Sequence, residues 1–242
     1  RCAVYEYVDG TPAAAGMVST HEIDAVVAFV RTLHSLRTAP GASQVGPAAE
    51  AFTTLEDLQE RIETRQQRLL VASTETNTAE RELIDFLNNE FMPVHQHMSD
   101  DVVNQWLGAG WSIGDQTPSE LLTLSPSDFG LHNALRNTGN QIVFVDFEYF
   151  GWDDPAKLIS DFLLHPGMEL NGDLKRRFLS QTIEIFAEDP ELETRTRLLH
   201  PLFCLKWCLI LLNEYLPGQA ARRGFAASSP GPSRILKARQ LI

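Results

Sequence analysis

The chain has 242 residues, of which 43% are hydrophobic, so one or two globular domains with a buried core are allowed. A formal net charge of −12 argues against a nucleic-acid partner, because binding to phosphates needs clustered lysine and arginine; it permits a cationic substrate but is also an ordinary route to solubility. Three cysteines without a disulfide framework and the lack of any run of eighteen apolar residues predict a cytoplasmic protein with no membrane span.

Apolar residues spaced three and four apart dominate the chain after a short opening strand, which predicts a mostly helical protein. The segments with this pattern are 20–36, 53–72, 78–107, 155–164, 173–187 and 191–216, followed by a short basic helix that ends at Ile242. Pro93 is expected to interrupt the third segment, because proline cannot donate the helical hydrogen bond. Asp154 followed by Pro155 is typical of a helix start. Stretches rich in Gly and Pro at 39–47 and 217–233 are expected to form loops.

Two segments contain most of the chemically informative residues, SPSDFGLHNAL (125–135) and IVFVDFEYFGWDDP (142–155). A short strand is expected at 121–124, leading into the first segment, and the second opens with an apolar strand. The RNTGNQ stretch between the segments favours a tight reversal near its Gly-Asn pair. An antiparallel hairpin turning there would place Asn133 roughly opposite Asp146, with the register open by a residue or so.

Asp128, Asn133 and Asp146 together suit phosphoryl transfer. Mg²⁺ takes few protein ligands, chiefly carboxylate and amide oxygens, and leaves other positions for water and phosphates. Asn133 and Asp146 would hold the Mg²⁺ of bound ATP, while Asp128 would orient the attacking hydroxyl and accept its proton. An ionised carboxylate at the end of a buried apolar run needs a partner, which a metal would supply to Asp146. The acceptor would supply a hydroxyl group.

At these residues the chain resembles the C-terminal lobe of the aminoglycoside phosphotransferase and choline kinase family, small-molecule kinases with a protein-kinase-like fold. The family shows His-Gly-Asp-x-x-x-x-Asn, then Asp-Trp/Phe-Glu and Gly-Asp-Pro. The matching residues here are Pro126-Ser127-Asp128 with Asn133, then Asp146-Phe147-Glu148 and Asp153-Asp154-Pro155. CAVYEYVDG (2–10) resembles the link between the two lobes, and AFVRTLHSL (28–36) resembles the first large helix. The resemblance therefore implies an α+β, mostly helical fold with a short catalytic β-hairpin.

The sequence departs from the family pattern in two places. Pro126 stands where relatives have a His that helps fix the catalytic loop, and His132 stands where relatives often have Gly. The loop is therefore expected to differ in detail. The chain also contains no glycine-rich loop followed by a strand lysine, which kinases use to clamp the nucleotide. We expect a C-terminal lobe without its N-terminal lobe, which would bind nucleotide poorly by itself.

The resemblance also implies a domain organisation and a nucleotide contact. Residues 1–10 would link the lobes, and 11–242 would form the helical catalytic and acceptor-binding lobe, with a helical insert at about 50–110. Backbone groups of the linker would meet the nucleotide base. The linker residues expected at this contact are Glu6, Tyr7 and Val8.

Further residues are candidates for supporting roles. Asp161 would brace the catalytic loop as a structural acid, or have no such role. The insert and the C-terminal helices would line the acceptor pocket, with Glu214 and Tyr215 as candidate contacts. Glu148 is either a second metal ligand or a solvated surface residue.

Two other functions remain open from the sequence. A non-catalytic kinase-like module that binds a ligand or a protein is suggested by Pro126 and by the missing N-terminal lobe. A metal-dependent phosphohydrolase has the acidic residues but no second metal cluster. The sequence does not distinguish an amino sugar, a choline-like molecule or another sugar as acceptor, nor does it determine the oligomeric state.

Overall fold

The computed structural model describes residues 7–13, 18–73, 77–168, 170–216 and 232–242. Contacts within the chain divide it into two compact units. The first unit comprises residues 1–51 and 117–196, and the second comprises 52–116 and 197–242.

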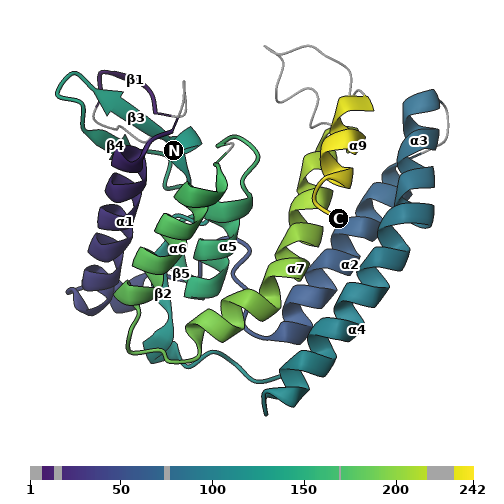
Figure 1. The fold of residues 1–242 in the computed structure, drawn as a ribbon, viewed down its shortest axis with the longest axis horizontal. Helices are drawn as coiled ribbons and strands as arrows, with labels where there is room; N and C mark the ends of the chain where they lie inside the picture. Colours follow the sequence, from purple (N-terminus) through teal and green to yellow (C-terminus); the bar gives the residue numbers. More distant parts are fainter. Residues whose placement is uncertain (1–6, 14–17, 74–76, 169, 217–231) are drawn as a thin grey trace. The chain divides into compact units, whose positions relative to one another are not determined.

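Among its described residues, the first unit contains three complete α-helices and the beginning of a fourth. They are α1 (Thr20–Ser35), α5 (Pro155–Leu164), α6 (Gly172–Ile185) and the first residues of α7 (Leu192–Leu211). Ser19 caps α1 in a capping box with Glu22, and the apolar face of α1 is fully buried. The helices α1 and α6 lie side by side (Figure 1). Asp154 caps α5, accepting from the Ala156 N–H at 2.7 Å, and Pro155 is its first residue, as predicted.

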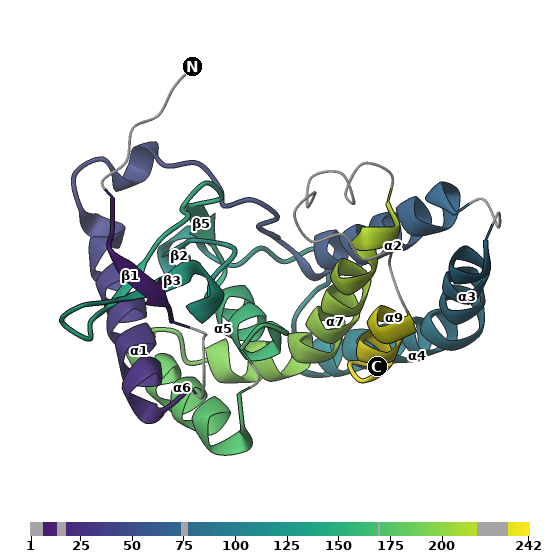
Figure 2. The same ribbon diagram turned by 90° about the horizontal axis from the view of Figure 1, so that it is seen from above.

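Two small antiparallel sheets complete the first unit (Figure 2). The strands are β1 (Gly10–Pro12), β2 (Thr123–Ser125), β3 (Ala134–Asn137), β4 (Ile142–Phe144) and β5 (Gly151–Asp153). One sheet has the order β1-β3-β4, and the other pairs β2 with β5. The predicted hairpin is confirmed as β3 and β4, with Ala134 opposite Phe144 and Arg136 opposite Ile142. The strand predicted at 121–124 begins two residues later, because Ser119–Leu121 forms a 3₁₀ turn.

The second unit is helical. Its elements are α2 (Leu55–Ala72), α3 (Thr78–Phe86), a π-helical turn (Leu87–Phe91), α4 (Met92–Gly108), the rest of α7, a 3₁₀ turn (Leu212–Tyr215) and α9 (Pro232–Arg239). The predicted interruption near Pro93 is confirmed. Pro93 cannot donate a helical hydrogen bond, and the π turn lies directly before it. The fold class is therefore α+β and mostly helical, as expected.

An aromatic cluster in the first unit supports the two informative segments. Phe129, next to Asp128, is buried and packs on Phe162 of α5, with ring centroids 5.5 Å apart. Phe144 at the end of β4 stacks on Phe29 of α1 at 4.3 Å. The polar loop is therefore anchored to α5 by buried aromatic rings, and the hairpin is anchored to α1 by half-buried ones.

Candidate functional site

The candidate catalytic loop, residues 125–133, begins with a three-residue turn. The N–H of Asp128 donates to the carbonyl of Pro126 at 2.9 Å, and the intervening Ser127 has a φ of +67°. In a γ-turn, the carbonyl of one residue accepts from the N–H two residues later. When the residue between them has a positive φ, the turn is of the rare, strained form. This conformation costs a non-glycine residue about 1–2 kcal/mol, so surrounding contacts must hold it.

Ser127 is held from three directions. Its N–H donates to the hydroxyl of Ser125 at 3.0 Å, and its own hydroxyl donates to the carbonyl of Ala49 at 2.5 Å. The ammonium of Lys157 donates to the same hydroxyl at 3.3 Å. The residue before Asp128 is thus fixed by a strand, a loop and a helix together.

Lys157 is a buried cation on α5 with two buried carboxylates around it. Its Nζ lies 2.7 Å from Asp153 and 3.3 Å from Asp161. Burial opposes the charged form, but these two carboxylates outweigh it and raise the pKa of Lys157. Asp161, expected to brace the loop, thus pairs with the lysine that holds Ser127. Lys157 was not singled out from the sequence, and Asp153 was named only within the Asp153-Asp154-Pro155 match, although the Asp-x-x-x-Lys-x-x-x-Asp spacing at one helical turn was a usable signal.

Asp128 is held by two side chains of its own loop. Asn133 Nδ2 donates to the Asp128 carbonyl at 2.9 Å and to its Oδ2 at 3.3 Å. His132 Nε2 lies 3.1 Å from Oδ1. The hydrogen bond with His132 is the main reason that the pKa of Asp128 is lowered, against the opposing effect of burial. The carboxylate is 45% exposed, so it is both fixed and accessible.

Asn133 joins the loop to the hairpin. Its N–H donates to the Gly130 carbonyl at 3.1 Å, and its carbonyl accepts from the Val145 N–H at 2.9 Å. Asn133 is therefore aligned with Val145 and not with Asp146, a shift of one residue from the predicted register. Because Nδ2 is engaged with Asp128, Oδ1 is the side-chain atom of Asn133 that can ligate a cation.

Asp146 differs from the expectation in one respect. It was expected to end a buried strand, but Ile142–Phe144 is only half-buried and Asp146 is exposed. The argument that desolvation demands a metal partner is therefore wrong, since water solvates this carboxylate. Asp146 instead has a φ of +65°, which an Asp tolerates better than most residues.

Electrostatics connect Asp146 with Asp128 through a nearby tyrosine. The pKa of Tyr149 is raised first by its hydrogen bond to Glu148 and by the negative charge of Glu148. The charges of Asp146 and Asp128 raise this pKa further. Three carboxylates thus act on one hydroxyl.

His165, at the C-terminal end of α5, is a site residue that the sequence did not indicate. Its ring is stacked on His132 with centroids 3.6 Å apart and planes within 1° of parallel. The Gly167 N–H donates to its Nδ1 at 3.1 Å. Burial, together with the His132 charge, lowers the pKa of His165 to about 4, so the ring is neutral at neutral pH. The spacing of four residues between Asp128 and His132 could have indicated their contact in the sequence. No neighbouring residue indicated that His165 joins them.

The other predicted site residues lie apart from this loop in the sequence. Glu6 falls outside the described residues, Tyr7 is 86% exposed and Val8 is half-buried, both without regular secondary structure. In the second unit, Glu214 pairs with Arg234. The Tyr215 hydroxyl is buried and, among the described residues, has no hydrogen-bond partner. The roles of these residues in nucleotide and acceptor binding stay predictions.

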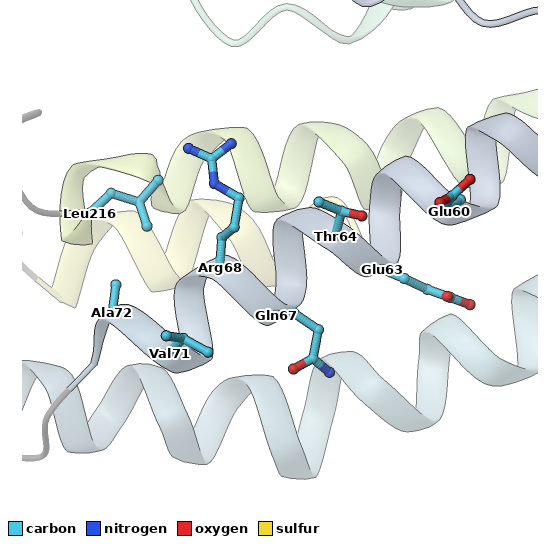
Figure 3. Close-up of a pocket in the computed structure, with 8 residues that line it drawn as sticks. All are labelled: Glu60, Glu63, Thr64, Gln67, Arg68, Val71, Ala72 and Leu216. Carbon is cyan, nitrogen blue, oxygen red and sulfur yellow. The ribbon is translucent and has the colours of Figure 1, made fainter.

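A pocket of about 700 Å³ lies within the second unit. Seven of its lining residues come from α2, and Leu216 contributes from beyond α7 (Figure 3). The α2 residues are Glu60, Glu63, Thr64, Gln67, Arg68, Val71 and Ala72. Arg68 extends on the side of Leu216, while Glu63 and Gln67 point the other way. The pocket includes neither Glu214 nor Tyr215.

Comparison with solved structures gives consistent matches. A choline kinase from Cryptosporidium parvum Iowa II matches with a TM-score of 0.55 and 13% identity over 98% of this chain and 69% of its own. A spectinomycin phosphotransferase in complex with ADP and spectinomycin matches with a TM-score of 0.56 and 11% identity over 97% and 69%. A choline/ethanolamine kinase family protein from Mesorhizobium loti matches with a TM-score of 0.51 and 17% identity over 95% and 66%.

The chain has the fold of these small-molecule kinases. It spans between 63% and 69% of the length of such proteins. No protein-family model and no curated protein matches the sequence. The kinase-like fold confirms the resemblance stated from Asp128, Asn133 and Asp146. No helix in the described part of the chain is both long and apolar enough to cross a membrane.

Proposed function

We propose that this chain is the C-terminal lobe of an ATP-dependent phosphotransferase of the aminoglycoside phosphotransferase and choline kinase family, acting on a hydroxyl group of a small molecule. The observation that carries the proposal is the arrangement of Asp128 and Asn133 within this fold. Asn133 orients the carboxylate of Asp128 through Nδ2 and keeps its own amide oxygen for a cation.

The donor set fits Mg²⁺. Asn133 Oδ1 and the carboxylate of Asp146 are hard oxygen ligands, and two protein ligands leave room for water and phosphates. Mg²⁺ held by these residues would supply positive charge that offsets the negative charge of the phosphates during transfer.

Asp128 acts on the acceptor. Its carboxylate accepts a hydrogen bond from the acceptor hydroxyl and aligns the oxygen with the γ-phosphorus of ATP. The new oxygen–phosphorus bond forms as the bond to the bridging oxygen of ADP breaks, and the hydroxyl proton passes to Asp128. Because the transition state is loose, alignment contributes more than basicity, which agrees with a carboxylate whose pKa is lowered.

The nucleotide clamp would lie outside these 242 residues. Neither a glycine-rich loop nor a strand lysine of the kinase type occurs in the sequence, and structures of this fold are about half as long again. ATP as co-substrate and three cysteines without a disulfide framework support a cytoplasmic location. The acceptor belongs to the range of amino sugars, choline-like amino alcohols and sugars.

The test is phosphotransfer by the natural full-length polypeptide, with Mg-ATP and a panel of choline, ethanolamine, spectinomycin and gentamicin. Asp128→Asn is expected to lower kcat by about 10²- to 10⁴-fold, because proton acceptance and alignment are both lost. Asp101→Asn, at an exposed position of α4, is the matched control and should keep full activity. Wild-type turnover by Asp128→Asn would disprove the role of Asp128.

A non-catalytic kinase-like module is the alternative, suggested by Pro126 in place of the family's His. The two functions differ in one measurement. A module would be stabilised against thermal unfolding by Mg-ATP or by a member of the panel in proportion to its concentration, yet would release no ADP.

A further inference from the structure

Among the described residues, one group brings three potential metal ligands together. Ligand atoms of Asp128, His132 and His165 all lie within 4.8 Å of one another. Two histidines and a carboxylate are a common set for transition metals. The geometry of the two rings decides whether they bind a metal or have another role.

The two rings are wrongly arranged for a shared metal ion. A histidine ligates through a lone pair in the plane of its ring, and the rings of His132 and His165 are parallel and stacked at 3.6 Å. Their in-plane lone pairs therefore cannot converge on one ion. In addition, His165 Nδ1 accepts from the Gly167 N–H, so the neutral ring carries its proton on Nε2. A metal-binding histidine has the opposite arrangement, with the second nitrogen donating to a neighbour.

A hydrogen bond donated by His132 to Asp128 explains the arrangement of the two rings. An ionised carboxylate only accepts, so the 3.1 Å contact requires that His132 Nε2 carries a proton and donates to Oδ1. We propose that His132 is a positioning residue that holds Oδ1 of Asp128 and so presents Oδ2 to the acceptor hydroxyl, with the ring of His165 as the platform that fixes the ring of His132. This inference rests on the proposed phosphotransfer function.

The surroundings of the two rings are shaped to fit them. A Cβ on Gly130 would come 2.6 Å from His132 Nδ1, and a Cβ on Gly167 would come 3.1 Å from the ring of His165. Met168 is buried beside them, and its sulfur accepts from the Leu131 N–H. The His132 Nδ1 is buried, and no described residue forms a hydrogen bond with it. Among the described residues, the hydrogen bond of the His132 ring is therefore the one between Nε2 and Asp128. The pair is therefore built into the fold and directed at one carboxylate.

Four variants of the full-length polypeptide separate the donor from the platform. His132→Phe keeps the stacked ring but removes the donor, and is expected to lower kcat by about 10- to 100-fold, because the carboxylate loses its alignment. The KM for Mg-ATP should stay unchanged, since His132 does not contact the nucleotide site proposed here. His132→Gln restores an N–H of similar reach and should recover most of the loss. His165→Ala removes the platform and should resemble His132→Phe, whereas His165→Phe restores a stacked ring and should recover most of that loss. His97→Phe, at an exposed position of α4, is the control.

The outcomes distinguish this inference from the proposed function. If Asp128→Asn is inactive while His132→Phe keeps wild-type kcat, the inference is wrong and the function stands. If His132→Gln is as poor as His132→Phe, an N–H donor at this position does not restore the alignment of Asp128, and the inference is also wrong. If Asp128→Asn keeps wild-type activity, the proposed function itself fails.

A spectroscopic measurement tests the inference without any acceptor. In ¹⁵N-histidine spectra of the 242-residue chain at neutral pH, His165 should be the Nε2–H tautomer, and His132 should have a protonated Nε2 whose resonance shifts in Asp128→Asn. An Nδ1–H tautomer for His165, or a His132 resonance indifferent to Asp128→Asn, would overturn the proposal. Titration with Zn²⁺ alone should show no stoichiometric site; binding that His165→Ala abolishes would establish a metal site instead.

Discussion

The loop that contains Asp128 and the segment that contains Asp146 each include one residue in the left-handed backbone conformation, but this conformation is stabilised differently in the two places. Ser127, before Asp128, is a strained residue held by Ser125, Ala49 and buried Lys157. Asp146 is itself the left-handed residue, exposed, at the end of a half-buried strand. The first arrangement depends on tertiary contacts, whereas the second depends on a residue type that tolerates the conformation.

The difference matches the two proposed roles. A group that aligns a hydroxyl must be held within a narrow range of positions, which the contacts around Ser127 and Asp128 provide. A carboxylate that ligates Mg²⁺ is drawn to the ion by charge and needs less prior fixation. Variants that remove either carboxylate, or the contacts that hold it, test this comparison.

The largest expected effect separates the two carboxylates by their dependence on magnesium. Asp128→Asn and Asp146→Asn should each lower kcat by about 10²-fold or more. Raising the Mg²⁺ concentration should recover part of the activity of Asp146→Asn, because a site with lowered affinity for Mg²⁺ is occupied again at a higher concentration of the ion. It should not help Asp128→Asn, where alignment is lost. Steady-state kinetics over a range of Mg²⁺ concentrations measures both; an identical response of the two variants would remove the distinction.

Lys157 contacts the loop that contains Asp128 through the hydroxyl of Ser127. Lys157→Met leaves Asp153 and Asp161 buried without their cation and is expected to lower the free energy of unfolding by about 3–5 kcal/mol. Lys175→Met, at an exposed position of α6, should change it by less than about 0.5 kcal/mol. Urea denaturation followed by circular dichroism compares the two. Equal stability of both variants would show that the buried cluster does not support the loop.

The hairpin is connected to α1 by Glu22, which pairs with Arg136 of β3 at 2.8 Å. Burial alone would raise the pKa of Glu22, but hydrogen bonds from Ser19 and Arg136 outweigh it and lower the pKa from 4.5 to about 2. The folded state therefore gains stability from this carboxylate above pH 4.5, and loses the gain as the pH falls toward about 2. Glu22→Gln should be less stable than wild type by about 1–3 kcal/mol at neutral pH, and the difference should shrink across this window. A constant difference in denaturation experiments down to acidic pH would contradict the assignment.

The smallest effects come from glycine at the two left-handed positions. Ser127→Ala should lower the free energy of unfolding by about 1–3 kcal/mol through lost hydrogen bonds, and Ser127→Gly should recover about 1 kcal/mol of that by removing the backbone strain. Asp146→Gly should be within about 0.5 kcal/mol of wild type, because the side chain is exposed. Thermal and urea denaturation of the three variants test this order. A Ser127→Gly protein less stable than Ser127→Ala would show that the γ-turn is not strained.

Much of the fold could be predicted from local patterns. The amphipathic stripe of α1, the cap at Asp154 and the interruption at Pro93 each depend on a few neighbouring residues, and all are observed. The hairpin followed from its turn residues. Its exact register did not, because the apolar run at 142–145 allows a shift of one residue and only packing against α1 selects one pairing.

The candidate site was predicted in part. The order and spacing of Asp128, Asn133 and Asp146 were enough to indicate the kinase-like fold that the structures at low identity share. The burial of Asp146 was predicted wrongly, since the strand before it is covered less than its composition suggests. His165 and Lys157 were missed as partners of the loop, because each lies some thirty residues away and is brought there by α5.

The amino-acid order alone determined which backbone segments become helix, turn or hairpin, and which oxygen-bearing side chains they carry, since these depend on interactions between near neighbours. Folding in three dimensions decided how those side chains are held. A buried ammonium beneath one serine, and two imidazole rings in contact beside one carboxylate, arise only when α5 packs against the loop, because the groups that meet there are distant in sequence and their interaction has no local signature.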